Sequence, residues 1–103
     1  MKETEIILIR HGETEWNSQQ RMQGHSNSDL SSVGQAQIQA LGQWMKNVPF
    51  YHIYSSDSLR AKQTAEAITQ FSGHELKIDL RLREKNLGVF EGLTSEEARE
   101  RHP

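Results

Sequence analysis

The clearest indication of a fold class in the sequence is the stretch Ile6-Ile7-Leu8-Ile9-Arg10-His11-Gly12-Glu13. Its four consecutive aliphatic residues are typical of a strand that is buried on both faces inside a parallel sheet. In such a sheet ligands bind beyond the carboxyl ends of the strands. The sequence therefore predicts a buried strand over residues 5–10 that brings Arg10 and His11 to a functional site.

Helical periodicity follows this strand. Apolar residues recur every three or four positions from Ser31 to about Asn47, as an amphipathic helix requires, and we expect Trp44 and Met45 of this helix in the core. A second apolar stripe predicts a helix from Leu59 to Phe71, which begins after a serine-rich cap and ends before Gly73.

Shorter signals complete the chain. We expect strands at residues 50–54 and 76–80, a loop with one helical turn at 13–27, an irregular segment at 86–92 and a last helix opened by the capping box Thr94-Ser95-Glu96-Glu97. Helices that alternate with strands indicate βαβ crossovers. The predicted fold is α/β, a parallel sheet with helices on both faces, and residues 1–103 form a single domain.

Composition excludes several functions. The chain has 12 basic and 14 acidic residues and a net charge of −2, so nonspecific attraction to nucleic acid or an anionic membrane has little basis. The run at residues 6–9 is far shorter than the roughly 20 apolar residues of a membrane span, and the N-terminus does not resemble a signal peptide. The absence of cysteine excludes disulfides and thiol nucleophiles and fits a reducing compartment, so we expect a cytoplasmic protein.

Polar side chains follow each predicted strand, and together they suit a phosphate. The strand ends deliver Arg10, His11, Asp57, Arg60, Arg83 and Glu84. Arginine donates paired hydrogen bonds to phosphate oxygens and keeps its charge, so Arg10 and Arg60 are candidate phosphate clamps. His11 is the candidate nucleophile, Gly12 would allow close approach of the backbone, and Glu84 is the candidate proton donor. The chemistry predicted is covalent phosphoryl transfer without a cofactor.

Each assignment has a simpler alternative. Arg-His-Gly at a strand end can be an ordinary turn, and Arg60 with Glu66, or Arg83 with Glu84, can be ordinary surface charges. His11 and Glu15 are four residues apart and could share a metal ion, although the loop between them makes a metal site the weaker interpretation. Solvent or core positions are expected for the remaining histidines, His25, His52, His74 and His102.

The chain resembles the histidine phosphatase superfamily, the phosphoglycerate-mutase-like proteins. The similarity is carried by residues 8–17, Arg21-Met22-Gln23-Gly24, Asp29-Leu30-Ser31, Ser55-Ser56-Asp57 with Arg60-Ala61 and Thr64-Ala65, and Leu82-Arg83-Glu84 with Gly88 and Glu91-Gly92-Leu93-Thr94. The resemblance implies that His11 is phosphorylated, that Arg10, Arg60 and Asn17 contact phosphate, that Glu84 donates a proton, and that Gln23 and Gly24 border the substrate entrance.

The chain also departs from this family. Family members are roughly twice as long, a full domain, and carry a second catalytic histidine in a later Ser-His-Gly-like motif, which neither His25 nor His102 matches. We therefore expect the N-terminal half of such a domain, with an exposed sheet edge and one phosphate ligand missing. The natural product is longer, the chain is a truncation, or two copies form a homodimer that covers the edge.

Three functions remain open at this point. The segment Arg21-Met22-Gln23-Gly24 and the compact stretch from Leu82 to Gly88 resemble the broad-specificity phosphatase branch, which favours hydrolysis of a small phosphorylated metabolite. The alternatives are a phosphoglycerate mutase and a truncated, non-catalytic phosphate-binding module.

Overall fold

A computed structural model describes residues 5–24, 26–84 and 91–101. Its elements are α1 (Glu15–Ser18), α2 (Ser32–Met45), β1 (Ile53–Ser55), α3 (Leu59–Ser72), β2 (Leu76–Ile78), the 3-10 helix η1 (Leu80–Leu82) and α4 (Ser95–Arg101). The helices predicted from residue 31 onward are confirmed, and so is the single helical turn at α1. Predictions about His25, His102 and most of the segment from Asn86 to Gly92 lie outside the described residues.

Local signals set the ends of the helices. Ser31 and Ser58 cap α2 and α3, because each side chain accepts a hydrogen bond from a backbone N–H of the first turn. Gly73, with φ of 74°, ends α3 in the left-handed conformation. At α4, Thr94 N donates to Glu97 Oε1 at 3.1 Å and Glu97 N donates to Thr94 Oγ1 at 3.2 Å. The predicted capping box is thus confirmed.

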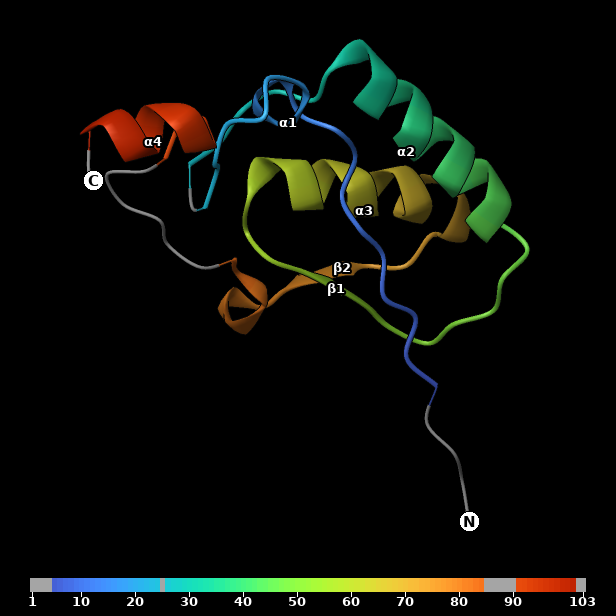
Figure 1. The fold of residues 1–103 in the computed structure, drawn as a ribbon. Coiled ribbons are helices and arrows are strands. Elements are labelled where there is room, and N and C mark those ends of the chain that lie inside the picture. Colours follow the sequence, from blue (N-terminus) through green and yellow to red (C-terminus); the bar gives the residue numbers. More distant parts are fainter. Residues whose placement is uncertain (1–4, 25, 85–90, 102–103) are drawn as a thin grey trace.

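The two strands form a parallel pair with the register Ile53 to Leu76, Tyr54 to Lys77 and Ser55 to Ile78. Helix α3 connects them, so the predicted βαβ crossover is confirmed for this part of the chain. Figure 1 shows α3 lying over the strand pair and α2 packed on α3, on the same side. Both long helices of the described residues therefore cover one side of the strands, whereas the sequence predicted helices on both.

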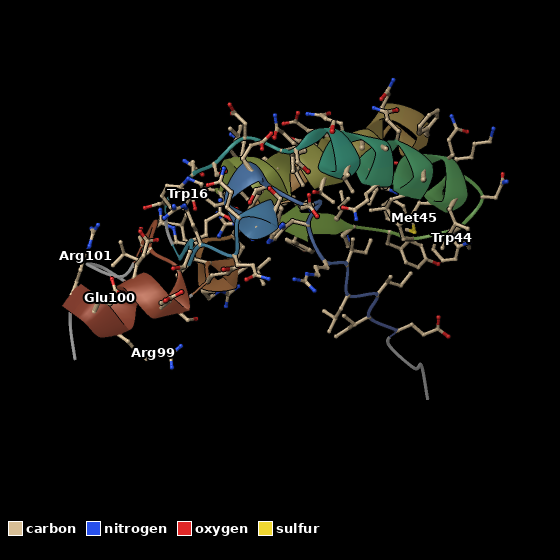
Figure 2. All side chains as sticks on the ribbon, turned by 45° about the horizontal axis from the view of Figure 1, so that its top comes forward. Trp16, Trp44, Met45, Arg99, Glu100 and Arg101 are labelled. Atoms are coloured by element: carbon tan, nitrogen blue, oxygen red, sulfur yellow. The ribbon has the colours of Figure 1, made fainter. Side chains whose placement is uncertain are left out.

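Close contact between α2 and α3 depends on small residues. A Cβ atom at Gly42 would lie 2.4 Å from the carbonyl oxygen of Ala67, so only glycine allows the two helices to approach this closely. Met45 is buried as predicted, but Trp44 is 66% exposed, which contradicts its placement in the core (Figure 2). The apolar stripe of α2 is wider than the surface that α3 covers.

The predicted strand at residues 5–10 does not form. This segment has an irregular backbone and is exposed throughout, with Leu8 90% exposed. The physical reason is that a central strand needs hydrogen-bonded neighbours, and the strand pairing in the described residues is confined to β1 and β2. Just after this segment, Gly12 N donates to Thr64 Oγ1 at 3.0 Å, a hydrogen bond that connects the chain to α3. Among the described residues, no helix is long and apolar enough to cross a membrane.

Candidate active site

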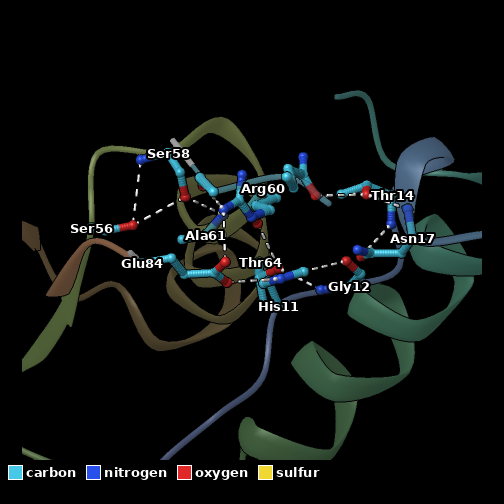
Figure 3. A network of polar contacts seen from close by, with 12 residues as sticks. His11, Gly12, Thr14, Asn17, Ser56, Ser58, Arg60, Ala61, Thr64 and Glu84 are labelled. Atoms are coloured by element: carbon cyan, nitrogen blue, oxygen red, sulfur yellow. Dashed lines mark hydrogen bonds and ion pairs between the residues drawn. The ribbon is translucent and has the colours of Figure 1, made fainter. Parts of the chain in front are cut away.

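Three segments that are distant in sequence bring His11, Arg60 and Glu84 together (Figure 3). His11 ends the extended segment, Arg60 lies in the first turn of α3, and Glu84 follows η1. Glu84 Oε1 lies 3.5 Å from His11 Nε2, and Glu84 Oε2 lies 3.3 Å from Arg60 Nη2. One carboxylate thus bridges the imidazole and the guanidinium, as the convergence predicted from the sequence requires.

The imidazole of His11 is held from its far side. Its Nδ1 lies 2.7 Å from the carbonyl oxygen of Gly12, a contact that requires Nδ1 to carry the proton and donate it. In this tautomer the lone pair of a neutral ring is on Nε2, the atom that faces Glu84. A Cβ atom at Gly12 would lie 2.8 Å from Cγ2 of Ile38, so glycine permits the backbone to pack closely against α2, and its approach to a ligand stays a prediction.

Arg60 is only 2% exposed, which contradicts the interpretation of this residue as an ordinary surface charge. Its Nη1 donates to the carbonyl oxygen of Ser26 at 3.0 Å, and its Nη2 donates to the carbonyl oxygen of Gly24 at 2.7 Å. These bonds orient the plane of the guanidinium, and the Glu84 carboxylate lies against its remaining edge. A buried arginine with fixed orientation is suited to bind an anion at that edge.

A buried polar network supports Arg60 from the loop before α2. One orientation of the Gln23 amide satisfies both of its ends: its oxygen accepts from Arg60 Nη1 at 3.2 Å, and its nitrogen donates to Thr14 Oγ1 at 3.0 Å. Thr14 is fully buried and caps α1, where Asn17 Oδ1 accepts from Thr14 N at 3.1 Å. The cap thus uses the side-chain oxygen Oδ1 of Asn17, so any contact of Asn17 with phosphate would have to come from its side-chain NH₂ group.

Arg10 does not join the site. It is exposed, and in the part of the chain that the structure describes it forms no hydrogen bond or ion pair with His11, Arg60 or Glu84. Its position follows from the segment at residues 5–10, which is not fixed by strand pairing. A phosphate contact by Arg10 therefore stays a prediction.

A second ion pair, which the sequence analysis did not predict, lies beside the site. Arg83 Nε donates to Asp57 Oδ1 at 2.8 Å, and Arg83 Nη2 donates to Asp57 Oδ2 at 2.6 Å. The hydrogen bonds that Arg83 donates to Asp57 raise the pKa of Arg83 above its ordinary value. The signal was available, because Asp57 and Arg83 carry opposite charges and follow adjacent parallel strands.

A cavity of about 160 Å³ opens between this pair and the site. It is lined by Gly24, Asn27, Asp57, Ser58, Arg60, Arg83 and Glu84. Gly24 lines this cavity and Gln23 is buried behind Arg60, so the position of either at a substrate entrance stays a prediction. Over residues 5–24, 26–84 and 91–101, no group of three or more metal-ligating side chains is placed to hold an ion.

With this geometry established, comparison with known proteins decides the family. The sequence model of the histidine phosphatase superfamily (branch 1) matches residues 6–103. The chain belongs to this superfamily. The fold and the superfamily that the sequence predicted are therefore confirmed.

Individual relatives of this chain within the superfamily carry names of different kinds. A protein of Salmonella typhi named "Probable phosphoglycerate mutase GpmB" is 43% identical over 98 residues, which are 90% of this chain and 46% of the relative. Bacillus stearothermophilus YhfR, a solved structure, is 42% identical in sequence, with a TM-score of 0.83. The match covers 88% of this chain and 45% of the YhfR chain. A mycobacterial glucosyl-3-phosphoglycerate phosphatase solved with VO₃ is 35% identical with a TM-score of 0.83, over 90% and 44% of the two chains. The chain thus spans about half the length of the relatives it matches.

Proposed function

We propose that this chain carries the phosphoryl-transfer site of an enzyme that hydrolyses small phosphomonoesters through a phosphohistidine on His11. The observation that carries the proposal is the single carboxylate of Glu84, placed between His11 Nε2 and the buried guanidinium of Arg60. Nucleophile, anion-binding group and acid thus converge on one site, where a phosphoryl group bound to Arg60 would separate His11 Nε2 from the Glu84 carboxyl group, with the attacked and leaving sides of phosphorus facing the two.

In the first step, the lone pair of His11 Nε2 attacks phosphorus. The P–N bond forms while the bond from phosphorus to the leaving oxygen breaks, and the carboxyl proton of Glu84 passes to that oxygen. The contact from His11 Nδ1 to the carbonyl of Gly12 keeps the lone pair on Nε2 and stabilises the positive charge that the ring gains. Arg60 stabilises the charge on the phosphoryl oxygens.

In the second step, water attacks the phosphorus of the phosphohistidine. The P–N bond breaks, its electron pair returns to Nε2, and the proton of the attacking water passes to the Glu84 carboxylate. Inorganic phosphate leaves, and the site returns to its starting protonation state. Glu84 therefore serves as acid in one step and as base in the other.

Glu84 lies where the phosphoryl group of a substrate would bind. Its carboxyl group occupies the edge of Arg60 where a phosphoryl group would bind, so a bound substrate would displace it from Arg60 toward the leaving oxygen. Asn17, through its amide NH₂ group, and Arg10 would complete the phosphate contacts. Gln23 and Gly24 hold Arg60, and Gly24 also borders the cavity that would accept the alcohol portion of the substrate.

Phosphoglycerate mutase activity is the second candidate, and a relative's name supports it. A mutase would transfer the phosphoryl group between phosphoglycerates, whereas a phosphatase would transfer it to water. Phosphoglycerate interconversion with a bisphosphoglycerate primer, at a rate well above phosphate release, would replace the hydrolytic proposal.

A non-catalytic phosphate-binding module is the third candidate. It would need only the oriented Arg60 guanidinium and the cavity beside it, and no proton transfer by Glu84. Location in the cytoplasm and pairing of two copies also stay predictions. Sedimentation velocity of the purified chain tests the pairing, since a homodimer would sediment as a concentration-dependent faster species.

The experiment for the function is phosphate release from an aryl phosphate by the purified chain, beside His11→Ala. Release that disappears in His11→Ala supports a phosphatase that is complete enough to turn over. Binding of phosphate without release, from a folded sample, supports the non-catalytic module. Release that persists in His11→Ala would remove His11 as the nucleophile.

A further inference from the structure

Glu84 lies at the end of residues 79–84, a segment that we call the arm. The arm leaves the strand pair at Asp79, whose N–H donates to the carbonyl oxygen of Ser55 at 2.9 Å. It then turns through η1, where Leu80 and Leu82 are exposed. An ion pair between Arg81 and Asp79, at 2.7 Å, joins two residues within the arm. Neither the turn at η1 nor the Arg81–Asp79 ion pair fixes the position of Glu84 relative to α3.

The Asp57–Arg83 ion pair supplies such a connection. Asp57 lies in the loop before α3, where Ser58 caps the helix and contacts Ser56 through its hydroxyl at 3.0 Å (Figure 3). Arg83 directly precedes Glu84, and Asp57 lies three residues before Arg60. The ion pair therefore joins the same two segments that the contact between Arg60 and Glu84 joins.

We propose that Asp57 and Arg83 are positioning residues, whose paired hydrogen bonds hold the chain at Glu84 beside Arg60 and His11, so that the Glu84 carboxyl group stays within reach of a phosphoryl group bound there. The inference rests on the proposed role of Glu84 as acid and base. Two parallel N–H···O bonds restrict both distance and orientation, which a single contact does not. Because both partners are substantially exposed, the pair contributes little to overall stability, and its main effect is on geometry.

Catalysis is sensitive to such geometry. Misplacement of a catalytic group by about 1 Å can slow a reaction by about 100-fold. Glu84 lies 3.5 Å from His11 Nε2 and 3.3 Å from Arg60 Nη2, so a small shift of the arm would remove both contacts. Proton transfer matters most when the leaving group is a basic alkoxide, so the loss should be concentrated on alkyl phosphates.

The test removes the pair without changing net charge, by combining Asp57→Asn with Arg83→Gln in the 103-residue chain. We expect kcat for an alkyl phosphate to fall about tenfold or more, with kcat for an aryl phosphate changed less than about threefold. Inorganic phosphate should bind more tightly, because the competing carboxylate has left Arg60. Arg83→Lys, which keeps one ionic contact, should give intermediate values.

Two controls distinguish positioning from a general structural effect. Asp79→Asn with Arg81→Gln removes the ion pair of the same residue types within the same arm and should leave both rates and phosphate affinity unchanged. In a Glu84→Gln background, removal of the Asp57–Arg83 pair should add nothing further, because it acts through Glu84. If the chain binds phosphate without turnover, the same two comparisons are made on phosphate affinity.

Several results would overturn the proposal. These are equal slowing of both substrates, an equal effect of the control pair, or a further loss in the Glu84→Gln background. If Glu84→Gln changes the rates and removal of the Asp57–Arg83 pair does not, the positioning role is rejected and the proposed function is retained. Absence of phosphate binding in every variant, or turnover that survives His11→Ala, would reject the proposed function and this inference together.

Discussion

Arg60 combines near-complete burial with hydrogen bonds to two backbone carbonyls and a carboxylate contact at its open edge. Burial of a charged group is costly unless it is satisfied, so the surrounding acceptors stabilise the guanidinium in one orientation. Such a group is positioned before a ligand arrives, and little reorganisation is needed when phosphate binds.

Arg60→Ala should therefore weaken binding of inorganic phosphate by about 1.5 to 3 kcal/mol, the range for a hydrogen bond to a charged group. Isothermal titration calorimetry measures the change. Arg81→Ala is the matched control, because Arg81 is exposed and pairs only with Asp79 among the described residues. Unchanged affinity in Arg60→Ala would assign Arg60 a purely structural role.

The sequence predicted the reacting residues better than their supports. His11, Arg60 and Glu84 were predicted because each follows a predicted strand, and the structure brings them together although the strand predicted before His11 does not form. The sequence did not show that Gln23 and Thr14 would form a buried network behind Arg60, because such a network depends on the path of an irregular loop. Arg10 was predicted at the same site, but its place depended on a strand that does not form.

At the scale of elements, the packing of α2 on α3 fixes the first turn of α3 and with it Arg60. Gly42→Ala should destabilise the chain by about 1 to 3 kcal/mol, because the new methyl group would meet the carbonyl oxygen of Ala67 at 2.4 Å. Gln43→Ala, at the exposed neighbouring position, should leave stability within about 0.5 kcal/mol. Chemical denaturation measures both, and equal stabilities would contradict the close helix contact.

Helix α4 connects to the loop that holds Arg60. Arg21 Nη1 donates to Glu97 at 2.7 Å, and the backbone N–H of Met22 donates to Leu93 at 2.8 Å. The backbone N–H of Thr94, followed by the Arg21 charge, lowers the pKa of Glu97 below its ordinary value of 4.5. Glu97 therefore stabilises the folded state above its unfolded pKa, and this contribution is lost as pH falls through the folded pKa.

Acidification below the ordinary pKa of Glu97 should thus loosen the contact between α4 and residues 21–24. In Glu97→Gln this part of the pH dependence should disappear. Unfolding followed from pH 6 down to pH 3 measures it, with Glu100→Gln, an exposed α4 glutamate, as the control. An identical pH profile in Glu97→Gln and the parent chain would contradict the linkage.

Elements were predicted well where their signals are local. Ser31, Ser58, Gly73 and the Thr94 capping box set helix ends through contacts within a few residues, so the sequence carries them directly. The strand at residues 5–10 failed because strand formation depends on partners elsewhere in the chain. Trp44 failed because periodicity identifies an apolar stripe without showing how much of it a neighbouring helix covers.

At the scale of the whole molecule, order is concentrated where α2, α3 and the strand pair meet. Hydrogen exchange should show protected amides in α2 and α3, around the buried core of Leu30, Ile38 and Ala67. Residues 6–9 should exchange rapidly, because their backbone is exposed and unpaired with a strand of the described residues. Protection of residues 6–9 equal to that of the helices would mean that another polypeptide, or a second copy, supplies strand partners.

Phosphorylation of His11 is tested most directly by quenching the chain rapidly, without acid, during its reaction with an aryl phosphate. Peptide mapping of the quenched sample should find one acid-labile phosphoryl group on His11. The same group should be absent from His11→Ala and more persistent in Glu84→Gln, in which no carboxylate activates water. Phosphate release at the normal rate with no phosphoryl group on His11 would contradict the account.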